Sequence, residues 1–155
     1  MRNSLFSIAL MATCASVAAL PARAEERTVG SVSGWQVSLI TNGGRFMGCA
    51  AVHNRLDGAT AIGMDGGGNW LLAFDMRGPN GVLPAQLNID GRVWYFSISS
   101  DGTKVSFGPS LQIMNAVRAG NNLTVSVNGQ SFHTDLVGSS AAMSMVQNCV
   151  QTAGD

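Results

Sequence analysis

The sequence predicts a single mainly β domain, an antiparallel β-sandwich or flattened barrel of about seven to nine strands with two short helices, one of them C-terminal. Three observations predict this fold class. Apolar and polar residues alternate with period two along most of the chain after residue 34, as in half-buried strands. Asp-Gly and Asn-Gly pairs, which favour tight hairpin turns, recur between these segments. Helical periodicity begins only near residues 110 and 139.

Residues 1–24 have the pattern of a bacterial export signal. Arg2 gives a positive start, Leu5–Leu20 is an uncharged and mostly apolar run, and Ala22-Arg23-Ala24 follows the small-x-small rule of signal peptidase. We therefore expect this segment to be removed and the mature protein to be periplasmic or secreted. The alternative is lipidation at Cys14, although the residues before it fit that signal poorly. No other stretch approaches the length of a membrane span, so no stable span is expected.

The mature composition excludes several function classes. Seven basic residues remain against nine acidic ones, and the basic residues are scattered, so no nucleic-acid partner is expected. Two cysteines remain, Cys49 and Cys149, and an even pair in an exported domain predicts one disulfide. Metal binding is the alternative, but two isolated thiols without a nearby histidine cluster cannot complete a zinc site. We therefore expect no metal and no cofactor.

The first half of the mature chain is expected to hold four strands. Residues 25–34 are polar and are expected to form a flexible lead-in to a single β-rich domain over residues 35–155. The glycine-rich segment at 65–69 is expected to be a turn rather than a phosphate loop, because a strand and not a helix follows it. The expected strands are Trp35–Leu39, Phe46–Val52, Ala59–Met64 and a strand on which Trp70, Leu72, Phe74 and Met76 share one face.

A three-stranded meander over residues 86–107 is the clearest local architecture. Asp90-Gly91 and Asp101-Gly102 separate its three apolar segments and predict two-residue turns. Both registers place the large apolar side chains on one face, as a correct register must. The predicted cross-strand pairs are Leu87 with Trp94, Ser100 with Thr103, Ile98 with Val105, and Phe96 with Phe107.

Two helices and a hairpin complete the chain. A short helix is expected between an N-cap at Ser110 and Gly120. A hairpin turning at Asn128-Gly129 follows, and a terminal helix begins at about Ser139. The apolar stripe of that last helix includes Cys149, which can therefore reach a buried strand. Expected stripes and pairs are Ile113, Met114 and Val117; Ala142, Met143, Val146, Cys149 and Val150; Phe132 with Val125; and His133 with Thr124.

Two groups of residues could carry chemistry, and a structural role is favoured for both. Ser126, His133 and Asp135 share a strand face and could be read as a hydrolase triad, but a solvated strand face is the favoured interpretation. Cys49 and His53 also share a face and could form a reactive pair, but a disulfide-bonded Cys49 beside a structural histidine is favoured. The strained G-x-S-x-G turn of α/β-hydrolases is missing. No catalytic residue is therefore expected.

Several short motifs occur in the order typical of a known family. They are Gly34-Trp35-Gln36-Val37, Leu87-Asn88-Ile89-Asp90-Gly91, Val117-Arg118-Ala119-Gly120 running into Asn121-Asn122-Leu123-Thr124-Val125, and Leu136-Val137-Gly138-Ser139-Ser140-Ala141-Ala142. This order resembles the invasion-associated locus B family of alphaproteobacterial envelope proteins. The resemblance implies a small exported β-rich domain with no established catalytic residues, and some members are tied to host-cell invasion. The chain departs from the family because no cysteine follows Trp35 closely and its second cysteine lies in the last helix.

These observations favour a non-enzymatic exported bacterial envelope protein that acts as a binding or interaction module. The resemblance implies a role related to host interaction, with an envelope or host protein as the partner. The alternative is an inhibitor of a secreted hydrolase such as a lysozyme or protease, because small disulfide-bonded exported β domains suit that function. An enzyme is the third hypothesis.

Overall fold

The computed structural model describes residues 23–153. Cys14 and all but the last two residues of the predicted export signal lie outside this range. None of the helices in that range is long and apolar enough to cross a membrane. The described residues form ten strands and two helices: β1 (Ala24–Val32), β2 (Trp35–Asn42), β3 (Arg45–Arg55), β4 (Gly58–Asp65), β5 (Trp70–Asp75), β6 (Gly81–Ile89), β7 (Arg92–Ser100), β8 (Lys104–Phe107), α1 (Leu111–Ala119), β9 (Asn122–Val127), β10 (Gln130–Asp135) and α2 (Ser139–Ala153).

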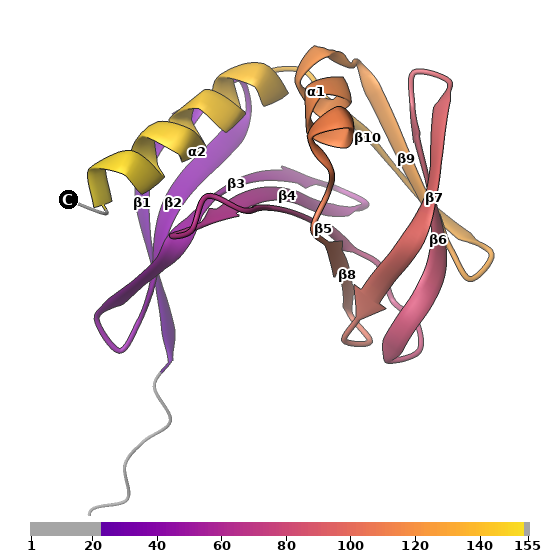
Figure 1. Cartoon of the computed structure of the whole chain (residues 1–155), viewed down its shortest axis with the longest axis horizontal. Coiled ribbons are helices and arrows are strands. Elements are labelled where there is room, and N and C mark those ends of the chain that lie inside the picture. The colour runs from indigo at the N-terminus through magenta and orange to yellow at the C-terminus, as the bar shows by residue number, and fades with distance from the viewer. Residues whose placement is uncertain (1–22, 154–155) are drawn as a thin grey trace, which may run out of the picture.

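All ten strands belong to one antiparallel sheet, in the order β1-β2-β3-β4-β5-β8-β7-β6-β9-β10. The sheet bends strongly, so that β3, β4 and β5 form an arch between β1–β2 and β6–β7 (Figure 1). The prediction of a mainly antiparallel β domain with two helices, one of them C-terminal, is confirmed. The strands form a single open sheet, however, and not a two-sheet sandwich or a closed barrel.

The extra strand β1 corrects the prediction for the start of the domain. Residues 25–34 were expected to be a flexible lead-in, but Ala24–Val32 pairs with β2 over its whole length, with one irregularity between Thr28 and Gly30. Most side chains of β1 are exposed, so the strand has little of the apolar alternation by which strands are recognised. Backbone pairing at the sheet edge holds it instead.

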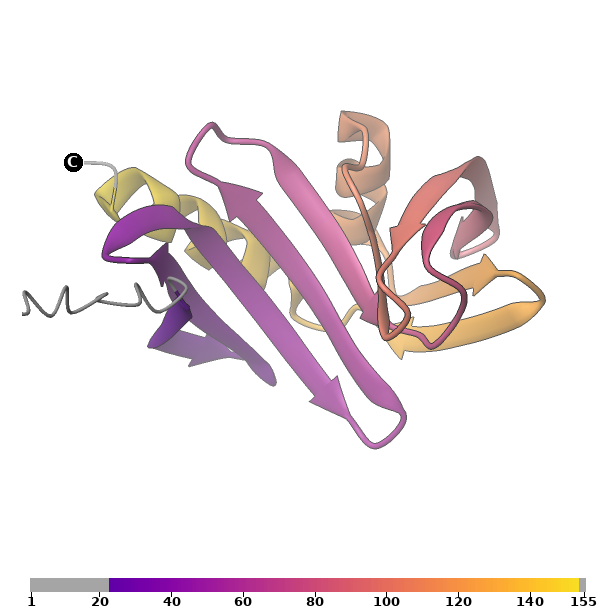
Figure 2. The same cartoon turned by 90° about the horizontal axis from the view of Figure 1, so that it is seen from below.

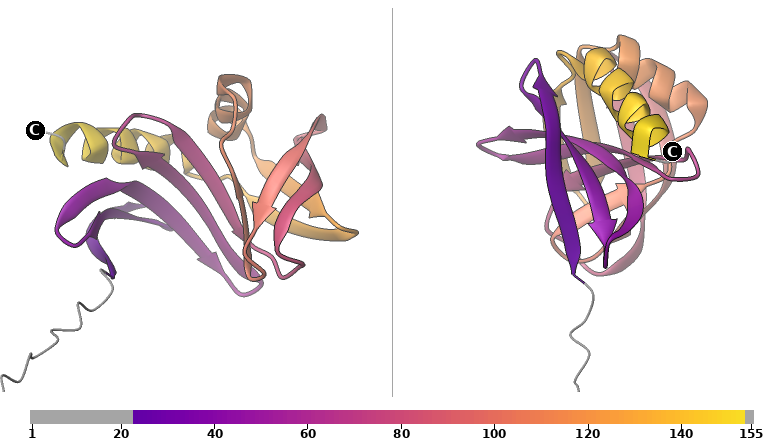
Figure 3. Two further views of the ribbon diagram at one scale, coloured as in Figure 1. Left: turned by 60° about the horizontal axis from the view of Figure 1, so that its bottom comes forward. Right: turned by 90° about the vertical axis from the view of Figure 1, so that its left-hand side faces the viewer.

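Both helices lie on the same side of the sheet (Figure 3). α2 packs on β1 to β4 and against α1. The predicted N-cap is confirmed, because Ser110 Oγ accepts a 3.3 Å hydrogen bond from the N–H of Ile113. The hydroxyl of Ser139 is buried and donates to the carbonyl of Val117 over 2.7 Å, which joins the two helices. The predicted stripes are buried in both helices, except at one residue: Ile113, Met114 and Val117 in α1, and Ala142, Met143, Val146 and Cys149 in α2. Val150, the last predicted member, is only partly buried.

The Asp90-Gly91 and Asn128-Gly129 hairpins have the predicted registers, which pair Leu87 with Trp94, Phe132 with Val125 and His133 with Thr124. The register predicted at Asp101-Gly102 is wrong by two residues, because Ser100 pairs with Val105 and not with Thr103. The carboxylate of Asp101 accepts the backbone N–H groups of Thr103 and Lys104, which widens the turn. A shift of two residues keeps each side chain on its face. The rings of Phe96 and Phe107 therefore still meet, with centroids 4.1 Å apart.

Candidate binding surfaces

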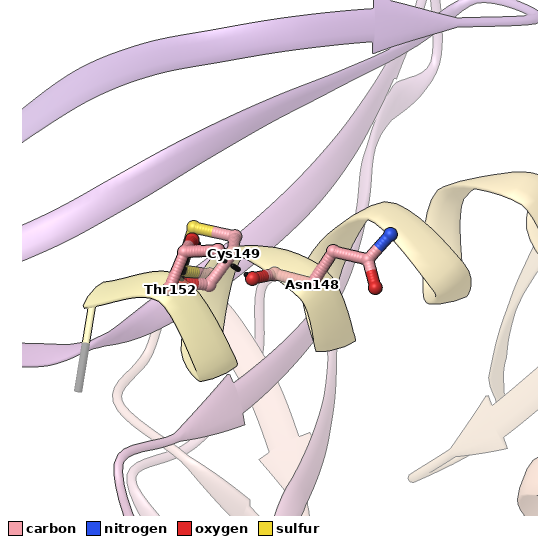
Figure 4. The surroundings of a disulfide bond; sticks show 4 residues. Asn148, Cys149 and Thr152 are labelled. Atoms are coloured by element: carbon pink, nitrogen blue, oxygen red, sulfur yellow. Dashed lines mark hydrogen bonds between the residues drawn. A yellow bond between two sulfur atoms is a disulfide. The ribbon is translucent and has the colours of Figure 1, made fainter. Parts of the chain in front are cut away.

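Cys49 and Cys149 form a disulfide whose Cα atoms lie 6.2 Å apart, as the sequence predicts (Figure 4). The bond joins β3 to α2 across the inner side of the sheet, and the two residues are only 1% and 8% exposed. Thr152 lies beside Cys149, and its hydroxyl donates to the carbonyl of Asn148 over 2.9 Å (Figure 4). The disulfide therefore fixes the last turns of α2 on the sheet.

His53 does not act with a free Cys49 thiol, because that sulfur is bonded to Cys149. Its ring packs on the indole of Trp35, with centroids 5.0 Å apart. Trp35 is fully buried and pairs directly with His53 across β2 and β3. The histidine thus covers one side of the buried indole, in agreement with the structural role favoured by the sequence. Between residues 23 and 153, no three His, Cys, Asp or Glu side chains gather so that they could hold a metal ion.

The imagined triad on β9 and β10 is not assembled. Ser126 Oγ lies 2.8 Å from the hydroxyl of Ser131, and His133 Nδ1 lies 2.8 Å from the hydroxyl of Thr124. The third member, Asp135, is bound to an arginine of β3. Each side chain therefore has a cross-strand or ion-pair partner outside the triad, as expected of a solvated strand face.

The arginine that binds Asp135 is Arg55, at the end of β3. Arg55 also lies 3.7 Å from the carboxylate of Asp57, across the tip of the β3–β4 hairpin. Between them stands Leu56, whose side chain is fully exposed. The ion pair attaches this hairpin to β10, although 80 residues separate its two partners. Pattern analysis of the sequence could not have found a pair so distant.

In the turn at Asp65, the backbone N–H groups that could bind a phosphate already donate to the Asp65 carboxylate. One oxygen of the Asp65 carboxylate accepts the N–H groups of Gly67 and Asn69, both over 2.9 Å. The side-chain amide of Asn69 also donates to the carboxylate over 3.0 Å, and this bond, followed by the backbone bonds, lowers the pKa of Asp65 below its ordinary value. The segment is therefore a self-capped turn, as predicted.

The side of the sheet opposite the helices carries small side chains. Seen from that side, β3, β4 and β5 lie in front and α2 lies behind them (Figure 2). We call this surface the underside. Two rows of directly paired residues cross it: Ala50–Gly63–Leu71 on β3 to β5, which continues to the buried Ser38 of β2, and Gln36–Val52–Ala61–Ala73–Ser106–Ser99 from β2 to β7. Small residues leave the backbone close to the surface and make the underside shallow.

One depression of about 260 Å³ interrupts the underside at its β3–β5 end. Met47 and Leu71 stand on its rim and are 48% and 46% exposed. Ile40 adds further apolar lining, and the floor is formed by Ala50 and Gly63. The depression therefore offers an apolar contact within a shallow surface, which suits a protruding apolar side chain of a partner.

The fold is similar to that of a solved structure. The crystal structure of invasion associated protein B from Bartonella henselae superposes with a TM-score of 0.56 over 77% of this chain and 95% of that chain, at 15% sequence identity. No protein-family model matches the chain. No curated protein sequence matches it either.

The likeness to invasion associated protein B extends to the fold alone at this level of identity. It agrees with the expectation of a β-rich domain that the short motifs raise. The motif at residues 87–91 forms the β6–β7 turn, and the motif at 117–125 joins α1 to β9. There Asp90 accepts the N–H groups of Asn121 and Asn122 over 2.8 and 3.0 Å. Two of the motifs are thus joined to each other and serve the architecture rather than a chemical site.

Proposed function

We propose that the protein is a non-enzymatic, exported envelope protein that docks a partner protein on the underside of its sheet. The depression rimmed by Met47 and Leu71 carries the proposal, because large side chains about half exposed beside small ones can gain contact area when a partner is bound. We also propose that the protein is a member of the invasion-associated locus B family. Membership is supported by the ordered motifs and by the shared fold with invasion associated protein B.

A binding experiment with envelope extract tests the docking surface. We expect the tagged mature protein to retain a partner that Leu71→Asp loses, because an unpaired carboxylate would then be buried in the contact. Leu111→Asp is the matched control, since Leu111 is also exposed but lies on α1. Equal retention by wild type and both variants would place the contact elsewhere.

Export is tested by the intact mass of protein recovered from the periplasm. Cleavage after Ala24 is expected to leave Glu25 as the first residue. A mass that corresponds to lipidated Cys14 would contradict both the cleavage site and the unanchored state.

The absence of an enzymatic function is tested with ester, peptide and glycoside substrates. No turnover above that of heat-denatured protein is expected, because the hydroxyl of Ser126 has no general base as its partner. Turnover that disappears in His133→Ala would show that chemistry occurs on this strand face.

The β3–β4 hairpin favours a second candidate, the inhibition of a secreted hydrolase. Leu56 is fully exposed at its tip, and the Arg55–Asp135 ion pair holds the base of the hairpin to β10. A rigid hairpin with one apolar side chain at its end can enter an enzyme cleft at low entropic cost. Lysozymes and proteases should then be inhibited by wild type and not by Leu56→Ser.

A further inference from the structure

The outer side of β6, β7, β9 and β10 carries an uncharged polar surface that neither helix covers (Figure 1). We call this surface the outer face. Directly paired residues form two rows on it: Tyr95–Gln86–Ser126–Ser131 and Val93–Asn88–Thr124–His133. The buried side chains of the same strands point to the other side, toward the core. The rows are therefore a consequence of the sheet register.

The first row combines an aromatic ring with hydroxyl and amide groups. Tyr95 is 79% exposed and stands at the β7 end. Gln86 follows with an amide, which can donate and accept, and Ser126 and Ser131 provide two hydroxyls. Neighbouring strands lie about 4.8 Å apart, so the row extends for about 14 Å in a nearly straight line. That length suits a short extended ligand.

The polar groups of the outer face are held in place before any ligand binds. The hydroxyls of Ser126 and Ser131 lie 2.8 Å apart, and Thr124 Oγ1 lies 2.8 Å from His133 Nδ1. A hydroxyl that gives or takes one such bond still has further capacity, because it has one donor and two lone pairs. Groups ordered in advance bind with less loss of side-chain entropy.

Charge distinguishes among the possible ligands. Neither row contains a carboxylate, Lys or Arg, and the Arg55 at the β10 end is already paired with the carboxylates of Asp135 and Asp57, so phosphate or sulfate groups find no unpaired Lys or Arg here. The guanidinium of Arg92 lies over the indole of Trp94, 5.1 Å from the ring centroid, and both residues alternate with those of the two rows. The apolar side chains on this side of the sheet, Val82, Pro84, Val93 and Tyr95, lie on β6 and β7, so the middle of the two rows is polar. A protein partner would require apolar area at the centre of the contact. A neutral polyhydroxylated ligand matches the surface best.

A polar depression of about 280 Å³ adjoins the β10 end of the second row. Its lining includes Thr124 and His133 of that row, together with Asn122, Asp57 and the paired Arg55 and Asp135. Carboxylates and amides at such a position can accept and donate hydrogen bonds to hydroxyl groups. The depression therefore extends the polar surface at one end, while Tyr95 provides an apolar contact at the other.

We propose that the outer face binds a neutral oligosaccharide. A sugar ring stacks on Tyr95, and the following units run across β6 and β9 toward β10, with their hydroxyls bonded to Gln86, Ser126 and Ser131. Tyrosine suits this role because its ring offers a flat, rigid contact at low entropic cost. The outer face lies on the same side of the sheet as the underside but over other strands, so the proposal concerns a different region and stands independently of the proposed docking function.

Nuclear magnetic resonance of the ¹⁵N-labelled mature protein tests the proposal, with cellotetraose, chitotetraose and maltotetraose as probes. At least one probe is expected to shift amide signals of β6, β7, β9 and β10. Tyr95→Ala should weaken that binding about tenfold or more, whereas Tyr95→Phe should retain most of it because the ring stays. Leu111→Ser, on the exposed side of α1, should leave the affinity unchanged.

Three results would overturn the proposal. They are no shift with any of the three tetrasaccharides, shifts confined to the underside, and unchanged affinity in Tyr95→Ala. Binding of an anionic tetragalacturonate alone would also contradict it, because a charge-based site would then operate. Tyr95 is a surface residue, so the variants are expected to remain folded, and their thermal unfolding midpoints provide the check.

Discussion

The indole Nε1 of Trp35 donates a 2.8 Å hydrogen bond to the carbonyl of Val137, 102 residues further along the chain. Trp35 begins β2, and Val137 lies two residues before α2. The Cys49–Cys149 disulfide attaches the same helix near its other end. α2 is thus held at both ends to neighbouring strands of the sheet.

Replacing Trp35 with Phe should destabilise the protein by about 2–3 kcal/mol. The change removes the hydrogen bond to Val137 and leaves a small cavity at a fully buried position. Urea unfolding followed by circular dichroism measures the effect. Leu111→Ala, at an exposed position, is expected to stay within about 0.5 kcal/mol of wild type. An equally small effect for Trp35→Phe would mean that Val137 contributes no stabilising contact.

Removing the disulfide with the double substitution Cys49→Ala, Cys149→Ala should cost about 2–5 kcal/mol. The bond closes a segment of 100 residues, so its loss enlarges the conformational freedom of the unfolded chain. Hydrogen exchange should rise first in the last turns of α2, which the bond holds on β3. Labelling of the unfolded, unreduced protein should find no free thiol at either residue, and labelled Cys49 or Cys149 in native material would contradict the pairing.

Phe96→Ala should lower the free energy of unfolding by less than Ile98→Ala does, although the phenylalanine substitution removes more atoms. The meander predicted from the sequence places Phe96 on its apolar face, and the ring is only partly buried against Phe107. Ile98 is completely buried. We expect about 1–3 kcal/mol for Phe96→Ala and about 2–5 kcal/mol for Ile98→Ala. Chemical denaturation of the two variants decides the order, and a larger loss at Phe96 would mean that its ring lies deeper in the core.

Stability should fall in acid as three turn carboxylates are protonated. The side-chain amide of Asn69, followed by backbone N–H groups, lowers the pKa of Asp65 below the ordinary 3.8. Backbone N–H groups are the main cause of the lowered pKa of Asp90 and of Asp101. A carboxylate whose pKa is lowered by folding stabilises the protein above its unfolded pKa, and this contribution is lost as pH falls through the folded pKa. Unfolding midpoints in urea should therefore decrease from about pH 4 downward.

Asp90→Asn isolates one of these carboxylates. Asp90 has a φ of 48°, a left-handed conformation that Asn also tolerates, so the backbone turn is retained. The variant should be less stable than wild type at pH 6, and its midpoint should change less between pH 5 and pH 2. An unchanged acid dependence would show that the bonds to Asn121 and Asn122 do not affect the titration.

Local chemistry explains which turns could be predicted from the sequence. Asp90-Gly91 and Asn128-Gly129 form the expected hairpins because both residues of each pair adopt positive φ angles. At Asp101 the same dipeptide forms a wider turn, since only Gly102 of that pair has a positive φ and the carboxylate caps the following N–H groups. A dipeptide identifies a turn, but the side-chain bonds that the dipeptide makes determine its length.

The arrangement of the strands could not be predicted from such signals. β5 pairs with β8, and β6 pairs with both β7 and β9, so the sheet order departs from the chain order after β5. The two rows of the outer face depend on this order, because Gln86 meets Ser126 only through the pairing of β6 with β9. The Arg55–Asp135 ion pair likewise depends on the bend that brings β10 near the β3–β4 hairpin. Individual strand faces were predicted, and the surfaces that they form together were not.

The hundred-residue separation of the two cysteines has a consequence for biosynthesis. The first five strands pair in chain order, from β1 with β2 to β4 with β5, so the nascent polypeptide can assemble them as it emerges. The helix that covers their apolar side emerges last, and Cys49 waits as a thiol until Cys149 arrives. During that interval the half-built sheet exposes Val37, Ala51 and Ile62, which makes it a substrate for chaperones and susceptible to mispairing with other chains.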